Sequence, residues 1–133
     1  MSKHETPFTR RYWKEVGGTL IEEFLAVKVG PGQGKRLLDG VIILDGPFEI
    51  RKASEVRIEG KDIIVVQTKA IRLGMYLMGQ ALFSVELIKK YNPRSIRSVA
   101  ICTKGDDVLE PLLAEAGLEL VVYPHPNQEL HER

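Results

Sequence analysis

The fold is decided by two apolar stretches, Leu37-Leu38-Asp39-Gly40-Val41-Ile42-Ile43-Leu44 and Ile63-Ile64-Val65-Val66-Gln67-Thr68-Lys69-Ala70. Short apolar runs bounded by turn residues are typical of buried strands. A buried strand seldom carries a charge without a partner or a metal ion, yet each of these carries one. The side-chain period of a strand places Gln67 and Lys69 on the same face. If the two strands pair, an Asp, a Gln and a Lys converge on one patch.

The remaining pattern predicts one domain over residues 1–133, with loose termini at 1–9 and 124–133. Gly, Pro, Asn and Asp residues punctuate the chain and set the boundaries of the expected elements. We expect helices at 10–28, 72–91 and 106–116, strands at 35–44, 63–69, 96–102 and 118–123, and a short strand or irregular segment at 48–58. The order α-β-β-β-α-β-α-β predicts an α/β fold, a mixed central sheet flanked by helices.

The first expected helix decides which glutamate could reach the patch. Its apolar stripe would be formed by Trp13, Val16, Leu20, Phe24 and Val27, which is typical of a helix packed on a sheet. Gly17-Gly18 would weaken its middle by about 1 kcal/mol per glycine. On this helix Glu23 borders the stripe and Glu22 points away. We therefore expect Glu23 to approach Asp39.

The ordered set of these residues resembles the PD-(D/E)XK nuclease superfamily, whose core is restriction-endonuclease-like. Its pattern is a helical Glu, an Asp on one strand, Glu/Asp-x-Lys on the next strand, and then a helix. This chain has Glu22-Glu23, Asp39, Gln67-Thr68-Lys69 and a helix with Gln80, and the resemblance covers roughly residues 16–91. Leu38 replaces the Pro before the Asp, and Gln67 replaces the second carboxylate.

The resemblance implies that the chain hydrolyses DNA phosphodiester bonds with Mg²⁺ or Mn²⁺. Asp39 would be the main metal ligand, with Glu23, the amide oxygen of Gln67 and the backbone carbonyl of Thr68 as further ligands. Lys69 would orient the attacking water or stabilise charge on the phosphate. The expected substrate-binding residues are Gln80, Arg36, Ser84 and Tyr76.

Charge is distributed unevenly along the chain, although the net charge is only +1. Residues 1–105 hold 18 Lys/Arg and 11 Asp/Glu, whereas residues 106–133 hold one Arg and seven Asp/Glu. The basic part contains the expected site, and phosphate contacts dominate affinity for nucleic acids. DNA is therefore the expected partner, although the same charges would also suit an ordinary solvated surface.

Several function classes are excluded or left open. No apolar run is long enough for a membrane span, and the lone Cys102 fits a reducing cytoplasm. The turn Gly30-Pro31-Gly32-Gln33-Gly34 lacks the spacing of a phosphate-binding loop.

Because Gln67 removes a negative charge, the alternative is a weakened or inactive module that binds nucleic acid or a partner protein. Whether the chain forms a homodimer, as many small family members do, is left open.

Overall fold

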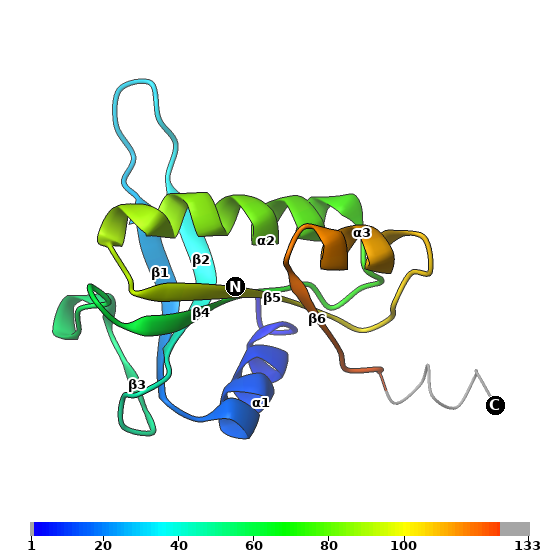
Figure 1. Cartoon of the computed structure of the whole chain (residues 1–133), viewed down its shortest axis with the longest axis horizontal. Helices are drawn as coiled ribbons and strands as arrows, with labels where there is room; N and C mark the ends of the chain where they lie inside the picture. Colours follow the sequence, from blue (N-terminus) through cyan, green and yellow to red (C-terminus); the bar gives the residue numbers. More distant parts are fainter. Residues whose placement is uncertain (1, 126–133) are drawn as a thin grey trace.

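The computed structural model of the chain describes residues 2–125 and contains one central sheet with helices on both faces (Figure 1). Short 3₁₀ turns cover Ala53–Glu55 and Lys89–Tyr91. The regular elements are α1 (Thr6–Val16), β1 (Thr19–Val27), β2 (Arg36–Ile43), β3 (Glu49–Arg51), β4 (Asp62–Thr68), α2 (Met75–Ile88), β5 (Ser95–Cys102), α3 (Leu109–Glu115) and β6 (Glu119–Val122).

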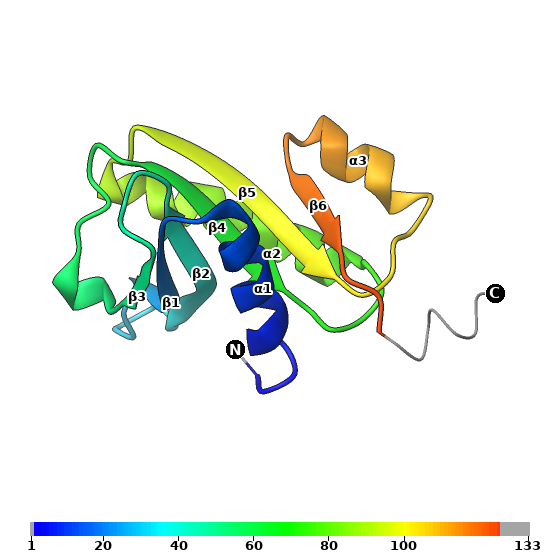
Figure 2. The ribbon, with the colours of Figure 1, turned by 90° about the horizontal axis from the view of Figure 1, so that it is seen from below.

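The sheet has six strands in the order β3-β1-β2-β4-β5-β6. β2 is antiparallel to both of its neighbours, β1 and β4. The edge strand β3 is parallel to β1. At the other side of the sheet, β4, β5 and β6 are parallel to one another. α2 lies along one face and α1 lies on the opposite face, as the two perpendicular views show (Figures 1 and 2). The predicted mixed sheet flanked by helices is confirmed.

Each face of the sheet buries its own apolar cluster, because neighbouring strand residues point to opposite faces. On the α1 face, Tyr12 and Trp13 pack on a cluster that includes Leu20, Ile42, Ile64, Val66, Val99 and Ile101. On the α2 face, Ile88 packs on a cluster that includes Ile21, Val41, Ile43, Ile63 and Val65. The paired centres of β2 and β4, residues 40–43 and 63–66, carry no polar side chain because both of their faces are covered.

The helix predicted over residues 10–28 is wrong in its second half. α1 ends at Val16, and Thr19–Val27 forms β1 instead. Gly17 and Gly18 adopt φ values of 81° and 82°, a region that residues with a Cβ rarely enter. The glycine pair therefore terminates the helix and turns the chain into the sheet. The observed order is consequently α-β-β-β-β-α-β-α-β.

The other predicted elements lie within a few residues of the observed ones, and the ambiguous segment 48–58 contains β3 and a 3₁₀ turn. The start of the chain differs, because α1 begins at Thr6 within the stretch 1–9 expected to be loose. Pro7 in the first turn suits a helix start. Of the expected loose end 124–133, residues 126–133 lie outside the described residues. Within the described part, no helix has the length and apolar character needed to cross a bilayer.

Candidate functional site

Asp39, in the middle of β2, links this strand to the end of β4. The backbone N–H of Thr68 donates to Asp39 Oδ2 at 2.8 Å, and the backbone N–H of Asp39 donates to Gln67 Oε1 at 3.4 Å. Regular pairing of the two antiparallel strands reaches Gly40 and Val66, just before this point. The carboxylate thus takes the place of a backbone acceptor where the ladder stops. The strands β2, which carries Asp39, and β4, which carries Gln67 and Thr68, are neighbours as predicted, and Lys69 directly follows β4.

Asp39 is held in an environment that disfavours its charge. Burial raises the pKa of its carboxyl group above the ordinary value, and the neighbouring Glu5 raises it further. The hydrogen bond from Thr68 and the charge of Lys69 act in the opposite direction. A half-buried carboxylate beside a second one is an arrangement that a cation would stabilise.

Lys69 lies at the same edge, immediately after β4. Its backbone N–H donates to the carbonyl of Ile101 at 2.9 Å, which continues the pairing with β5. Its Nζ is 4.0 Å from Glu5 Oε2 and 5.5 Å from the centre of the Tyr76 ring. Lys69 therefore lies between the start of α1 and the start of α2.

Glu5 is a carboxylate that the sequence interpretation missed. It precedes α1 at its N-cap position, and only 13% of its side chain is exposed. Thr9, one turn later, fixes this end of α1, because its hydroxyl is 2.8 Å from that of Thr68 in the buried layer. The signal in the sequence was the Glu-Thr-Pro start of a helix, which the assignment of residues 1–9 as loose concealed.

Gln67 is committed to interactions within the protein. Its side chain is buried, its oxygen accepts from Asp39, and its Nε2 donates to Ser84 Oγ at 2.7 Å. The hydroxyl of Ser84 in turn donates to the backbone carbonyl of Gln80. Both ends of the amide are used, so Gln67 ties β2 and β4 to α2 rather than presenting an open oxygen.

The structure places Glu23 differently from the prediction. It lies on β1 rather than on a helix, is exposed, and has a φ of 51°, an uncommon value for a residue other than glycine. The flanking pairs Glu22–Gly40 and Phe24–Leu38 bring its backbone opposite Asp39. Glu22 instead accepts two hydrogen bonds from Arg10, at 3.0 and 2.9 Å. A role for Glu23 in metal binding stays a prediction.

The four residues expected to bind substrate line one groove between α2 and β2. Its volume is about 740 Å³. Tyr76, Gln80 and Ser84 come from α2 and Arg36 from the start of β2, and Gln67 also lines the groove. Tyr76 is 73% exposed. The groove thus adjoins the Asp39–Lys69 edge through Gln67 and Tyr76.

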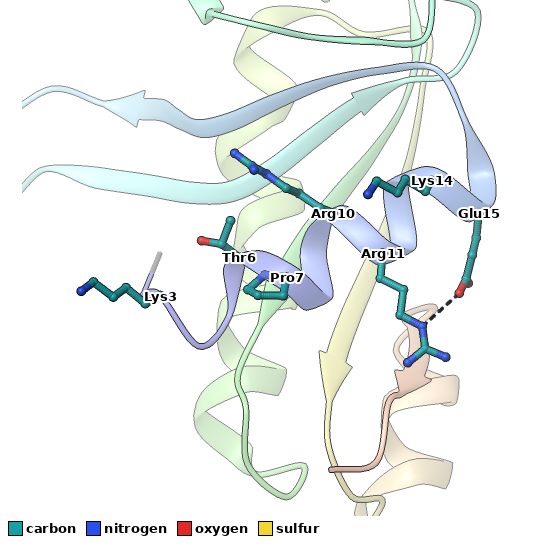
Figure 3. Close-up of a pocket in the computed structure, with 7 residues that line it drawn as sticks. All are labelled: Lys3, Thr6, Pro7, Arg10, Arg11, Lys14 and Glu15. Atoms are coloured by element: carbon teal, nitrogen blue, oxygen red, sulfur yellow. Dashed lines mark ion pairs between the residues drawn. The ribbon is translucent and has the colours of Figure 1, made fainter. Parts of the chain in front are cut away.

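A second hollow, of about 780 Å³, lies over the outer side of α1 (Figure 3). Its lining residues are Lys3, Thr6, Pro7, Arg10, Arg11, Lys14 and Glu15. Arg11 is 3.5 Å from Glu15, whereas Arg10 points away from that pair toward the sheet (Figure 3). Four cations against one carboxylate make this helix face a basic surface.

Comparison with known proteins supports the fold. No family model and no curated protein matches the chain. Among solved structures, a structure of an EndoMS–dsDNA complex matches with a TM-score of 0.53 and 16% sequence identity. The match covers 94% of this chain and 47% of that one, so the chain spans about half the length of its structural neighbour. The chain therefore shares the α/β fold of the matched part of that structure.

Proposed function

We propose that the chain is a PD-(D/E)XK-type domain that binds DNA and hydrolyses its phosphodiester bonds with Mg²⁺ or Mn²⁺. The observation that carries the proposal is the meeting of Asp39, Lys69 and Glu5 where the end of β4 lies beside the middle of β2. The fold shared with a structure of an EndoMS–dsDNA complex supports it. The helix before the first strand provides a glutamate, as the family pattern requires, but that glutamate is Glu5 rather than Glu23.

The oxygen donors at this edge fit a Mg²⁺ ion. Within residues 2–125 no three His, Cys, Asp or Glu side chains lie close enough together to hold a metal, so the site offers two carboxylates. Mg²⁺ is commonly bound through one or two carboxylates, with water and substrate phosphates completing its shell. Asp39 and Glu5 are the proposed ligands, with the Thr68 carbonyl as a further oxygen donor.

The chain's own groups complete the proposed chemistry. When bound, Mg²⁺ polarises a phosphate oxygen and promotes ionisation of the attacking water. The ammonium of Lys69 stabilises the negative charge that builds on the phosphate. Thr68 and Thr9 hold Lys69 and Glu5 in register through their buried hydroxyl contact. Gln67 positions Asp39 through its hydrogen bond to the Asp39 backbone.

A second candidate function follows from the hydrogen bonds of Gln67. Because its amide is engaged by Asp39 and Ser84, the third oxygen ligand of the family pattern is directed into the fold. A site with one negative charge fewer binds Mg²⁺ more weakly. The competing proposal is therefore a module that binds DNA without cutting it.

Gln67→Glu distinguishes the two candidates. A Glu side chain at this position can still accept the hydrogen bond from the Asp39 backbone, and it can accept from Ser84 once that hydroxyl turns away from the Gln80 carbonyl. Thermal unfolding of the variant is measured alongside cleavage. The added charge is expected to lower the half-maximal Mg²⁺ concentration by about 10-fold. Nicking of supercoiled plasmid over a Mg²⁺ series measures this.

Gln33→Glu is the matched control, because it adds the same charge in the exposed turn between β1 and β2. If Gln67→Glu cuts while the wild-type chain and Gln33→Glu do not, the wild-type chain is a module that does not cut DNA. If Gln67→Glu and Gln33→Glu cut like the wild-type chain, Gln67 has no part in metal binding.

The basic face of α1 is expected to contact DNA phosphates. Replacing Lys3, Arg11 and Lys14 together by Gln should reduce the slope of log affinity against log salt by about 0.9 per lost contact. Duplex binding measured by fluorescence anisotropy over a salt series tests this. Lys61→Gln is the control, because exposed Lys61 directly precedes β4, about 26 Å along the strand from Lys69. Equal slopes for the triple variant and the wild-type chain would contradict this surface assignment.

A further inference from the structure

The groove-facing side of α2 forms one continuous stripe. Tyr76, Gly79, Gln80, Phe83, Ser84 and Leu87 all line the groove, and their spacing of three, four and seven residues places them on one side of the helix. Tyr76 is 73% exposed and Phe83 is 65% exposed. Two helical turns separate them, so they lie about 10 Å apart along the axis.

The opposite rim of the groove is basic. Lys35, Arg36 and the 42% exposed Leu37 come from the β1–β2 connection and the start of β2. No Asp or Glu is found among the described residues that line the groove. At the Tyr76 end, Lys69 adds a further cation 5.5 Å from the ring centre. The groove therefore combines exposed aromatic rings with positive charge.

Two details of the stripe are unexplained by packing. Gly79 lies inside α2, where glycine costs about 1 kcal/mol relative to alanine, yet a Cβ built on it meets nothing within 4 Å. The side-chain oxygen of Gln80 is buried and has no hydrogen-bond partner among the described residues. An open helix surface and an unsatisfied amide both suit a ligand with a flat ring and polar edges.

We propose that this groove binds a segment of single-stranded DNA, whose bases stack on Tyr76 and Phe83 and whose phosphates face Lys35 and Arg36. Stacking on aromatic side chains beside a positively charged groove is how proteins bind unpaired strands. Gly79 lets a base approach the helix between the two rings, and a turn of the Gln80 side chain would bring its unsatisfied oxygen to a base edge. The proposal rests on the proposed function, since Tyr76 and Lys69 connect the groove to the site of cleavage.

Positive charge beside exposed rings favours an unpaired DNA strand over a second copy of the chain, whose acidic residues at 106–115 could meet the charge but have no rings to stack on Tyr76 and Phe83. A protein partner would cover the apolar side of α2 but would need acidic groups opposite Lys35, Arg36 and Lys69. An unpaired strand supplies phosphates and rings together. The groove adjoins the edge that carries Asp39 and Lys69. A single strand held there would lead into the proposed cleavage site, so the proposed substrate class is DNA with an unpaired segment.

The test measures binding of fluorescein-labelled oligo(dT) of about 16 nucleotides and of a duplex of equal length by anisotropy, in EDTA. Tyr76→Ala and Phe83→Ala should each weaken oligo(dT) binding by about 10-fold, and Phe83→Ala should leave duplex binding within about 2-fold. Gly79→Leu, which fills the groove without a clash in the helix, should weaken oligo(dT) binding likewise. Leu112→Ala, which removes an apolar side chain 51% exposed on α3, should change neither.

The outcomes separate this proposal from the proposed function. If the wild-type chain binds the duplex and all three groove variants bind oligo(dT) as tightly as the wild-type chain does, the groove proposal alone is overturned. A chain that binds neither DNA overturns both. Sedimentation could instead show that the chain self-associates, that Phe83→Ala abolishes the association and that oligo(dT) does not displace it. The groove would then be a contact between copies, and the single-strand assignment would be overturned.

Discussion

Asp39→Asn is expected to abolish Mg²⁺-dependent DNA cleavage while leaving the fold intact. The amide oxygen of Asn can still accept the hydrogen bond from Thr68 that closes the end of the ladder, so the free energy of unfolding should change little. The negative charge of the main proposed metal ligand is lost, however. Loss of a group that only orients a ligand costs about 10–100-fold, so removal of the ligand charge should lower the cleavage rate by more than about 100-fold. Plasmid nicking and thermal unfolding, measured side by side, check both halves.

Asp45→Asn is the matched control for this variant. Asp45 is a carboxylate in the turn after β2, its side chain is 75% exposed, and it lies outside the proposed site. It should cut like the wild-type chain, whereas Lys69→Ala should lose most activity because the charge opposite the phosphate is gone. Equal cleavage by Asp39→Asn and the wild-type chain would show that Asp39 has no part in the mechanism. It would also show that the Asp39–Lys69 edge is not the cleavage site.

Gly18→Ala is expected to destabilise the chain by about 3 kcal/mol or more. Its φ of 82° is unfavourable for any residue with a Cβ, which costs about 1–3 kcal/mol. The new Cβ would in addition lie 2.4 Å from the carbonyl oxygen of Ile43, and such overpacking costs a further 1–3 kcal/mol. Because β1 and β2 pair at this point through Thr19 and Ile43, neither strand can shift freely. A melting temperature lowered by more than about 10 °C is expected.

Gly60→Ala separates the two contributions. Gly60 also has a positive φ, of 73°, but a Cβ there would meet nothing within 4 Å. It should therefore cost only the conformational term of about 1–2 kcal/mol. If Gly18→Ala and Gly60→Ala lower the melting temperature equally, the close approach of Gly18 to β2 has no energetic importance.

The site was predictable in part because strand periodicity is a local property. Asp39 and Gln67-Thr68-Lys69 were placed on neighbouring strands from their apolar surroundings alone, and β2 and β4 do pair. The direction of the Gln67 amide was not predictable, since it depends on Ser84 from a helix 17 residues further along the chain. Glu5 was missed for a related reason, because its contact with Lys69 joins residues 64 positions apart.

The order of apolar runs and turn residues determined by itself that this chain forms a mixed α/β sheet, since burial on both faces demands unbroken apolar strands. It did not determine where the first helix ends. Leu20, Phe24 and Val27 satisfy helical spacing, but Leu20 and Phe24 are buried on the strand β1. Tertiary structure decided this, because an extended β1 gains pairing with β2 and β3 on its two sides. A helix through Gly17 and Gly18 would forgo those hydrogen bonds and the burial that accompanies them.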